Sequence, residues 1–202
     1  MVTLRSTDDG LRRLMLREPR GYPALCCNVL VRPTLPEADA AFVIMEQVEY
    51  PPMSGSNTIC VVTVLLETGL LPMTEPLTHL TLETPAGLVG VEATCVEGKV
   101  VAVEFRNVPA FAVHLDRTIE VPEVGSVTVD VAWGGMFYAI AAAPPLGFAL
   151  TPDEGADIVR VTEMIKAAAA EQLPAVHPEN PAISGVPIGQ LYGPSQTPGV
   201  PR

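Results

Sequence analysis

Residues 50–69 read YPPMSGSNTICVVTVLLETG, and the interpretation of the whole chain depends on this stretch. Two prolines precede a Ser-Gly-Ser turn, and the serine and asparagine that follow are residue types that cap the start of a helix. Gly69 is a favourable left-handed terminator, so we expect a helix over residues 56–68. Apolar residues occur on all its sides, which predicts a helix buried all round. The many β-branched residues make a strand the alternative.

Outward from this segment, apolar runs rich in β-branched residues alternate with turn residues. They predict strands at about 24–31, 40–48, 78–83, 87–95, 99–106, 110–115, 125–132, 135–143 and 182–192. Alternating residues on both sides of Glu97-Gly98 indicate a hairpin. A short helix should begin near Ser6 and close before Gly21, and an amphipathic helix over 152–172 should cover a sheet. The predicted fold class is α/β (α+β).

Composition limits the possible functions. The chain has 202 residues, of which 48% are hydrophobic and 17% charged, so it can form one large or two small globular domains. Its formal net charge is −11, and half of its 12 basic residues lie within the first 32 positions. The rest offers no basic face for nucleic acid. No apolar run is long enough to span a membrane and the start lacks a secretory signal, so we expect a cytoplasmic protein.

Four cysteines stand at positions 26, 27, 60 and 95. They form no CxxC pair and have no nearby histidine, so we expect no metal site. Cys26 and Cys27 lie in an apolar run, which predicts buried thiols. Reduced cysteines are typical of the cytosol.

The Ser-Gly-Ser turn is the candidate binding site. It lies directly before a helix, where unpaired backbone N–H groups and the positive end of the helix dipole can hold a carboxylate or a phosphate. Ser54 would then lie beside the bound anion. The alternative is that Ser54, Ser56 and Asn57 simply cap the helix. The chain lacks G-x-S-x-G, G-x-x-x-x-G-K and G-x-G-x-x-G, which leaves hydrolase-elbow, P-loop and Rossmann interpretations without support.

Several motifs together resemble the proline racemase family, which includes hydroxyproline epimerases and trans-3-hydroxy-L-proline dehydratases. They are EPRG at 18–21, MSGSNTIC at 53–60, ETG at 67–69, NVP at 107–109 and DVAWGGMFY at 130–138. The resemblance implies two similar lobes, each wrapping strands around a buried helix as in diaminopimelate epimerase, with the active site in the cleft between them. It also implies an enzyme that uses neither pyridoxal phosphate nor a metal.

The resemblance assigns roles to the turn before the first helix. Ser54 occupies the position of one acid/base residue, and the N–H groups of Gly55 and Ser56 would bind the substrate carboxylate. The family usually has a thiol at the position of Ser54 and often a histidine at that of Ser56, so this chain resembles a serine-bearing subgroup. A hydroxyl is a far weaker acid than a thiol, which disfavours symmetric two-base racemisation. We therefore expect dehydration of trans-3-hydroxy-L-proline, with proline racemisation or 4-hydroxyproline epimerisation as alternatives.

The family's second catalytic segment, of the Pro-Cys-Gly-Thr type, does not occur in this chain. Neither do its opening strands. We therefore expect residues 1–125 to be a first lobe without its opening strands, and residues 126–202 to be the start of an incomplete second lobe. An inactive fragment is the alternative of another class. The expected partner is a proline-type amino acid, and the sequence leaves association into a homodimer open.

Overall fold

The computed structural model describes residues 9–195 and 197. The chain divides into two compact units, Met1–Val108 and Pro109–Arg202. This division falls earlier than the expected boundary at 125/126. The reason is that strand β6 (Phe111–Val121) pairs with strand β7 (Gly125–Trp133) in one sheet, so the hairpin spans the expected boundary.

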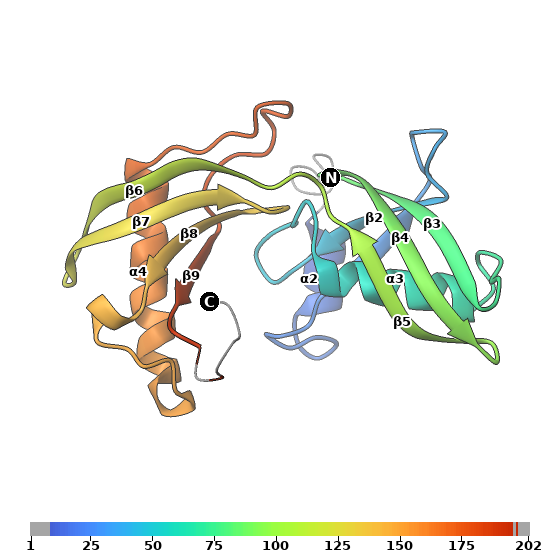
Figure 1. The fold of residues 1–202 in the computed structure, drawn as a ribbon, viewed down its shortest axis with the longest axis horizontal. Coiled ribbons are helices and arrows are strands. Elements are labelled where there is room, and N and C mark those ends of the chain that lie inside the picture. The colour runs from blue at the N-terminus through green and yellow to red at the C-terminus, as the bar shows by residue number, and fades with distance from the viewer. Residues whose placement is uncertain (1–8, 196, 198–202) are drawn as a thin grey trace. The chain divides into compact units, whose positions relative to one another are not determined.

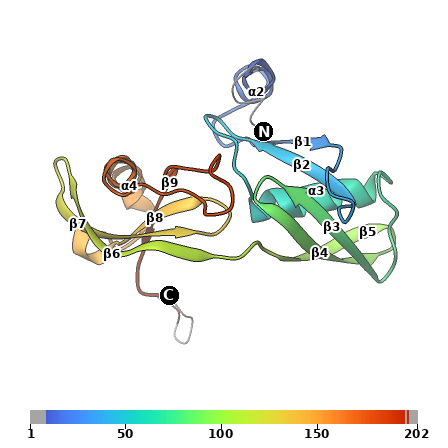
Figure 2. The same ribbon diagram turned by 90° about the horizontal axis from the view of Figure 1, so that it is seen from above.

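The first unit is a five-stranded sheet with one helix across it (Figures 1 and 2). Its strands, in spatial order, are β1 (Cys27–Val31), β2 (Ala40–Met45), β3 (Leu77–Thr84), β4 (Gly87–Val96) and β5 (Lys99–Arg106). Strands β2 and β3 are parallel, whereas the other neighbours are antiparallel. Parallel neighbours need a crossover connection, and helix α3 (Gly55–Glu67) supplies it.

The predicted hairpin between β4 and β5 is confirmed. Val91 pairs with Phe105 and Ala93 pairs with Val103. At the turn, Glu97 and Gly98 both have positive φ, 51° and 73°, as a type I′ turn requires.

Helix α3 confirms the predicted helix, and the strand alternative is wrong. Gly69, with φ of 72°, ends the segment as expected. The expectation that the helix is buried all round is also wrong. Its buried apolar residues are Val61, Val62, Leu65 and Leu66, whereas Ile59 is 40% and Val64 is 50% exposed. In the described chain the sheet covers one side of the helix, which leaves an apolar face open.

Helix α2 (Gly10–Leu16) docks beside β2 and confirms the predicted first helix from residue 10 onward. The expected start at Ser6 lies outside the described residues. Leu16 is 1% exposed and belongs to a buried cluster that includes Val43, Met45 and Tyr50. Arg12 donates hydrogen bonds to the main-chain carbonyls of Glu46 and Gln47. A helix this short is not stable alone, so these contacts hold it in place.

The second unit repeats the crossover. Its sheet has the order β6-β7-β8-β9, where β8 (Phe137–Ala142) and β9 (Ile188–Tyr192) are parallel and α4 (Gly155–Gln172) connects them (Figure 1). Short 3₁₀ turns, Pro144–Leu146 and Pro152–Glu154, precede this helix. As predicted, α4 packs on the sheet, burying Val161, Ile165, Ala168 and Ala169. Trp133 and Phe137 are buried in the core of this unit.

The cysteines depart from expectation. All four are free, but Cys26 is exposed and Cys27 is only half-buried. The prediction of two buried thiols is therefore wrong. The reason is that β1, which Cys26 precedes, is the edge strand of its sheet and has a neighbour on one side only.

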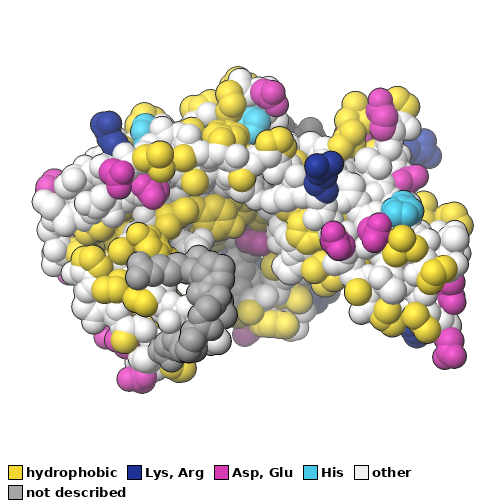
Figure 3. Space-filling model, in the orientation of Figure 1, with side chains coloured by type: hydrophobic (Ala, Val, Ile, Leu, Met, Phe, Trp, Pro, Cys, Tyr) yellow, Lys and Arg dark blue, Asp and Glu magenta, His cyan; other side chains and the backbone are white. Residues whose placement is uncertain are grey.

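The surface carries few basic groups. On the face shown in Figure 3, Lys and Arg side chains are scattered and do not gather into a patch. Among the described helices, none combines the length and hydrophobicity that crossing a membrane requires.

Candidate functional site

Ser54 lies at the junction between an anchored loop and helix α3. Its backbone is extended, with φ of −148° and ψ of 131°, and the helix begins at the next residue. The preceding loop is fixed by Tyr50 and Met53, which are 7% and 4% exposed. In addition, the N–H of Ala86 donates to the carbonyl of Pro52 at 3.3 Å. The position of Ser54 is thus set by packing on both sides.

The Ser54 hydroxyl is held by side chains. Asn57 Nδ2 donates to Ser54 Oγ at 3.0 Å, and Ser56 Oγ lies 3.3 Å from the same atom. No side-chain cap bond to the backbone is present at this residue. The capping alternative therefore does not describe Ser54, because its oxygen is not used by a backbone N–H. Asn57 is 6% exposed, so the amide that orients the hydroxyl is fixed by burial.

The start of α3 offers free backbone donors. The first backbone bond of the helix runs from Thr58 N–H to the carbonyl of Ser54 at 3.0 Å. Within the described part of the chain, no acceptor faces the N–H groups of Gly55 and Ser56. The first turn also carries no acidic side chain. These donors and the helix dipole together favour a bound carboxylate.

Helix α4 shows the opposite electrostatics. Asp153 and Glu154 lie in the 3₁₀ turn before it, and Asp157 lies in its first turn. The Glu154 carboxylate already accepts from the N–H groups of Ala149 and Thr151. These negative charges disfavour an anion at this end. Of the two long helices, α3 is therefore the one whose start suits a carboxylate ligand.

Position 55 has little room for a side chain. A Cβ built on this residue would lie 2.7 Å from Cζ of Phe105 on β5. The aromatic ring thus occupies the space beside the turn, and the absence of a side chain lets the backbone come close to it.

Two titratable side chains, at the start of β1 and the end of β2, were not predicted as site residues. Cys26 Sγ donates to Glu46 Oε1 at 3.7 Å. Burial raises the pKa of the half-buried Glu46 carboxyl, and burial followed by the nearby Glu46 carboxylate raises the pKa of the Cys26 thiol. The sequence signal that could have found them is the pair of strands predicted at 24–31 and 40–48. In the structure these strands pair in antiparallel register with Cys27 opposite Met45, which sets residues 26 and 46 side by side.

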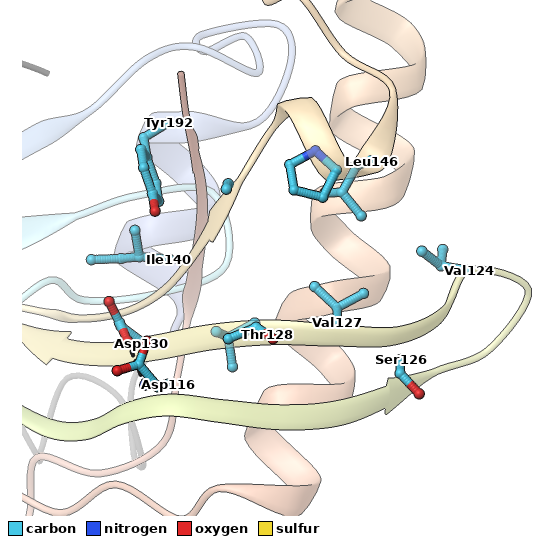
Figure 4. Close-up of a pocket in the computed structure, with 12 residues that line it drawn as sticks. Asp116, Val124, Ser126, Val127, Thr128, Asp130, Ile140, Leu146 and Tyr192 are labelled. Carbon is cyan, nitrogen blue, oxygen red and sulfur yellow. Dashed lines mark hydrogen bonds between the residues drawn. The ribbon is translucent and has the colours of Figure 1, made fainter. Parts of the chain in front are cut away.

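A second concavity lies in the other unit (Figure 4). This cavity of about 380 Å³ is lined by Asp116, Thr128, Asp130, Ile140 and Tyr192, among others. Asp130 Oδ1 accepts the Asp116 N–H at 2.8 Å, a bond between the paired strands β6 and β7. None of the predicted site residues lines this cavity.

The protein-family comparison decides the identity of the chain. The model of the proline racemase family matches residues 1–201. The chain belongs to the proline racemase family. The resemblance inferred from the motifs is thereby confirmed.

Two solved members of the proline racemase family resemble the structure closely. A probable proline racemase from Agrobacterium radiobacter K84, solved with bound carbonate, is 41% identical with a TM-score of 0.87. A hydroxyproline epimerase from Agrobacterium vitis, solved with bound trans-4-hydroxy-L-proline, is 39% identical with a TM-score of 0.86. Each match covers 91% of this chain and 55% or 54% of the relative. The chain thus spans about half the length of these relatives, and the predicted α/β fold class is confirmed.

The structure brings together the three residues predicted for the proline racemase site. Ser54, Gly55 and Ser56 form one continuous turn at the start of α3. In the described part of the chain, no three His, Cys, Asp or Glu side chains gather closely enough to hold a metal ion.

Proposed function

We propose that this chain carries one half of the active site of a cofactor-independent enzyme that acts at the α-carbon of a proline-type amino acid. The N–H groups of Gly55 and Ser56 bind the carboxylate, and Ser54 is one acid/base residue. The observation that carries the proposal is the Ser54 hydroxyl, oriented at 3.0 Å by a buried amide beside the free donors of a helix start. Membership of the proline racemase family supports the same chemistry.

The geometry suits proton transfer at Cα. Removing the Cα proton places negative charge on the carboxylate, and backbone donors already aimed at that group stabilise the charge as it develops. A serine hydroxyl is a poor free base at neutral pH. It serves better as a donor, either returning a proton to Cα or assisting loss of a ring hydroxyl.

Two reactions compete as the specific activity. Dehydration of trans-3-hydroxy-L-proline needs one base at Cα and one acid at the 3-hydroxyl, and it releases water and a pyrroline product. It is our first candidate, because Ser54 makes the two sides of the site chemically unequal. Epimerisation of 4-hydroxyproline, or racemisation of proline, is the second. It is favoured by the similarity to the epimerase that binds trans-4-hydroxy-L-proline.

Incubation in heavy water separates these reactions. The complete protein is mixed with L-proline, the 4-hydroxyproline epimers or trans-3-hydroxy-L-proline and followed by proton NMR. Loss of the Cα signal with inverted stereochemistry identifies epimerisation or racemisation, and a pyrroline product identifies dehydration. Ser54→Ala should abolish the reaction. Absence of Cα exchange with every amino acid would overturn the proposed function.

We also propose that the enzyme works in the cytoplasm. The four free cysteines support this, because oxidising compartments promote disulfides. Cell fractionation tests this location. Light scattering of the purified protein tests whether two copies associate into a homodimer.

A further inference from the structure

The loop that leads to Ser54 is hydrogen-bonded to a helix on the other side of the sheet. Helix α2 and helix α3 lie on opposite sides of β2 (Figure 2). From α2, the Arg12 guanidinium donates to the main-chain carbonyls of Glu46, at 3.1 Å, and of Gln47. In return, Gln47 Nε2 donates at 2.9 Å to the carbonyl of Leu16, the last residue of α2. Helix and loop are thus tied in both directions.

The same arginine also fixes Tyr50, the next buried residue of this loop. Arg12 is 7% exposed, and the Asp9 carboxylate accepts from its Nε at 2.6 Å and from its Nη2 at 2.7 Å. The hydrogen bond from Arg12 holds the pKa of the Asp9 carboxyl below its ordinary value, so the group stays charged at neutral pH. Tyr50 Oη donates to Asp9 Oδ1 at 3.3 Å, and the guanidinium lies 5.9 Å from the centre of the tyrosine ring. A two-point arginine–carboxylate pair has a defined geometry, so it defines the place of Tyr50 relative to α2.

Between Tyr50 and Ser54 the chain has little freedom. The rings of Pro51 and Pro52 fix their own φ angles and restrict the residue before each of them. Residues 50–53 are also all buried. A displacement of Tyr50 is therefore passed on to Ser54, because the connecting residues cannot absorb it.

We propose that Arg12 is a positioning residue of the Ser54 site, which it serves by holding Tyr50 through Asp9. This inference rests on the proposed function, in which the Ser54 hydroxyl delivers a proton. Proton transfer requires the two groups to lie within hydrogen-bond reach, and a misplacement of about 1 Å can cost ~10²-fold in rate. The backbone donors at the start of α3 depend less on α2, because this helix packs against β5. Loss of Arg12 should therefore impair proton delivery more than carboxylate binding.

The first test detects this coupling in the present chain without requiring activity. Hydrogen exchange is measured by NMR at the N–H of Thr58, which donates to the Ser54 carbonyl, with the N–H of Leu65 in the middle of α3 as internal reference. Arg12→Met removes the guanidinium donors, so exchange at Thr58 should become at least roughly tenfold faster than at Leu65, relative to wild type. Arg13→Gln removes one positive charge from the exposed side of the same helix and should change neither rate. Unchanged exchange at Thr58, or an equal rise at both sites, would overturn the coupling.

A milder variant keeps this test decisive if Arg12→Met does not fold. Tyr50→Phe retains the buried ring and removes the hydroxyl that donates to Asp9. Exchange at Thr58 should then rise roughly two- to tenfold over that at Leu65. No change at Thr58 in this variant would count against the coupling in the same way.

The second test follows the reaction of the complete protein in heavy water. The readout is the ratio of deuterium incorporated at Cα of the remaining substrate to product formed, which does not depend on the fraction of enzyme that is folded. Because Ser54 delivers the proton that completes the reaction, Arg12→Met should slow that step and raise the ratio roughly tenfold, with KM little changed. Arg12→Lys keeps a positive charge for Asp9 and should recover part of the loss. Arg13→Gln should behave as wild type.

The outcomes separate this inference from the function on which it rests. If wild type exchanges the Cα proton and Arg12→Met gives the same ratio, the positioning role of Arg12 fails and the proposed function stands. If wild type shows no Cα exchange with any of the amino acids, the proposed function fails, and the positioning role fails with it.

Discussion

At the scale of single residues, the site depends on contacts that are short and buried. Asn57 is the clearest example. Sequence reasoning treated it as a cap candidate, yet its side-chain amide donates to the Ser54 hydroxyl. The role of Asn57 could not be predicted, because a helix-capping residue type does not reveal whether its side chain bonds to the backbone or to the Ser54 hydroxyl.

Asn57→Ala should lower the free energy of unfolding. The change removes the buried amide that donates to the Ser54 hydroxyl, which costs about 1–3 kcal/mol, partly offset by the better helix propensity of alanine. Urea unfolding followed by circular dichroism measures the loss. Ser56→Ala is the matched control, since this residue is exposed and should change stability by less than about 0.5 kcal/mol. Equal effects of the two variants would contradict the role given to Asn57.

Gly55→Ala should also destabilise the protein. The added methyl meets the Phe105 ring at 2.7 Å, and overpacking of this kind costs about 1–3 kcal/mol. Adding Phe105→Leu should recover part of the loss. Gly155→Ala is the control, because nothing lies within 4 Å of its Cβ position and its φ of −52° suits alanine. That variant should be neutral or stabilising by up to about 1 kcal/mol. A neutral Gly55→Ala would show that the ring moves aside freely.

At the scale of elements, both ends of α3 are tied by polar contacts. Ser54 directly precedes the helix, and Glu67 at its other end accepts from Lys99 Nζ at 2.7 Å and from the N–H of Val100 at 3.0 Å. These two bonds, that of Lys99 first, hold the pKa of Glu67 below its ordinary value of 4.5. The helix is thereby fastened to the first residues of β5.

Acid should weaken this fastening. Because the folded pKa of Glu67 lies below the unfolded value, its contribution to stability is present above about pH 4.5 and is lost as the pH falls through the folded pKa. Wild type should therefore be more stable than Glu67→Gln at pH 7, and the difference should shrink as the pH falls below about 4.5. Urea unfolding across this range measures the difference. Glu104→Gln, on the exposed face of β5, should show no such convergence.

The elements themselves were largely predictable from sequence. Turn signals such as Gly69 and Glu97-Gly98 depend on the local sequence alone. The helix end at Gly69 and the hairpin turn at Glu97-Gly98 both form where they were predicted. The strand expected at 110–115 instead runs to Val121. Its pairing shifts register near Asp116, which has φ of 49°, and such an irregularity hides a long strand from a periodicity argument. Burial of α3 was overestimated, because apolar composition does not reveal which sides of a helix are covered.

At the scale of the whole molecule, each unit holds its own buried core. Leu82 on β3 is fully buried in the first unit, and Ile165 on α4 is 1% exposed in the second. The chain's single tryptophan, Trp133, belongs to the second unit. Its fluorescence therefore reports the unfolding of one unit alone.

Leu82→Ala should unfold the first unit earlier and leave the fluorescence transition in place. A cavity at this site costs about 2–5 kcal/mol. Circular dichroism should therefore show a transition at a lower urea concentration. The fluorescence of Trp133 should not change in that transition. Ile165→Ala should shift the fluorescence midpoint instead. A fluorescence shift in Leu82→Ala would show that the two cores unfold as one.

The β-α-β crossovers have a kinetic consequence. Their parallel pairs join residues distant in sequence, Ala40 with Leu82 and Tyr138 with Ile188, whereas the hairpins join near neighbours. Long loops close slowly, so the β4–β5 hairpin should form before the β2–β3 pair. Pulsed hydrogen exchange during refolding should then protect Ala93 and Val103 earlier than Ala41. Since Ser54 lies within the late-closing loop, the site becomes able to bind substrate only in the last stage of folding.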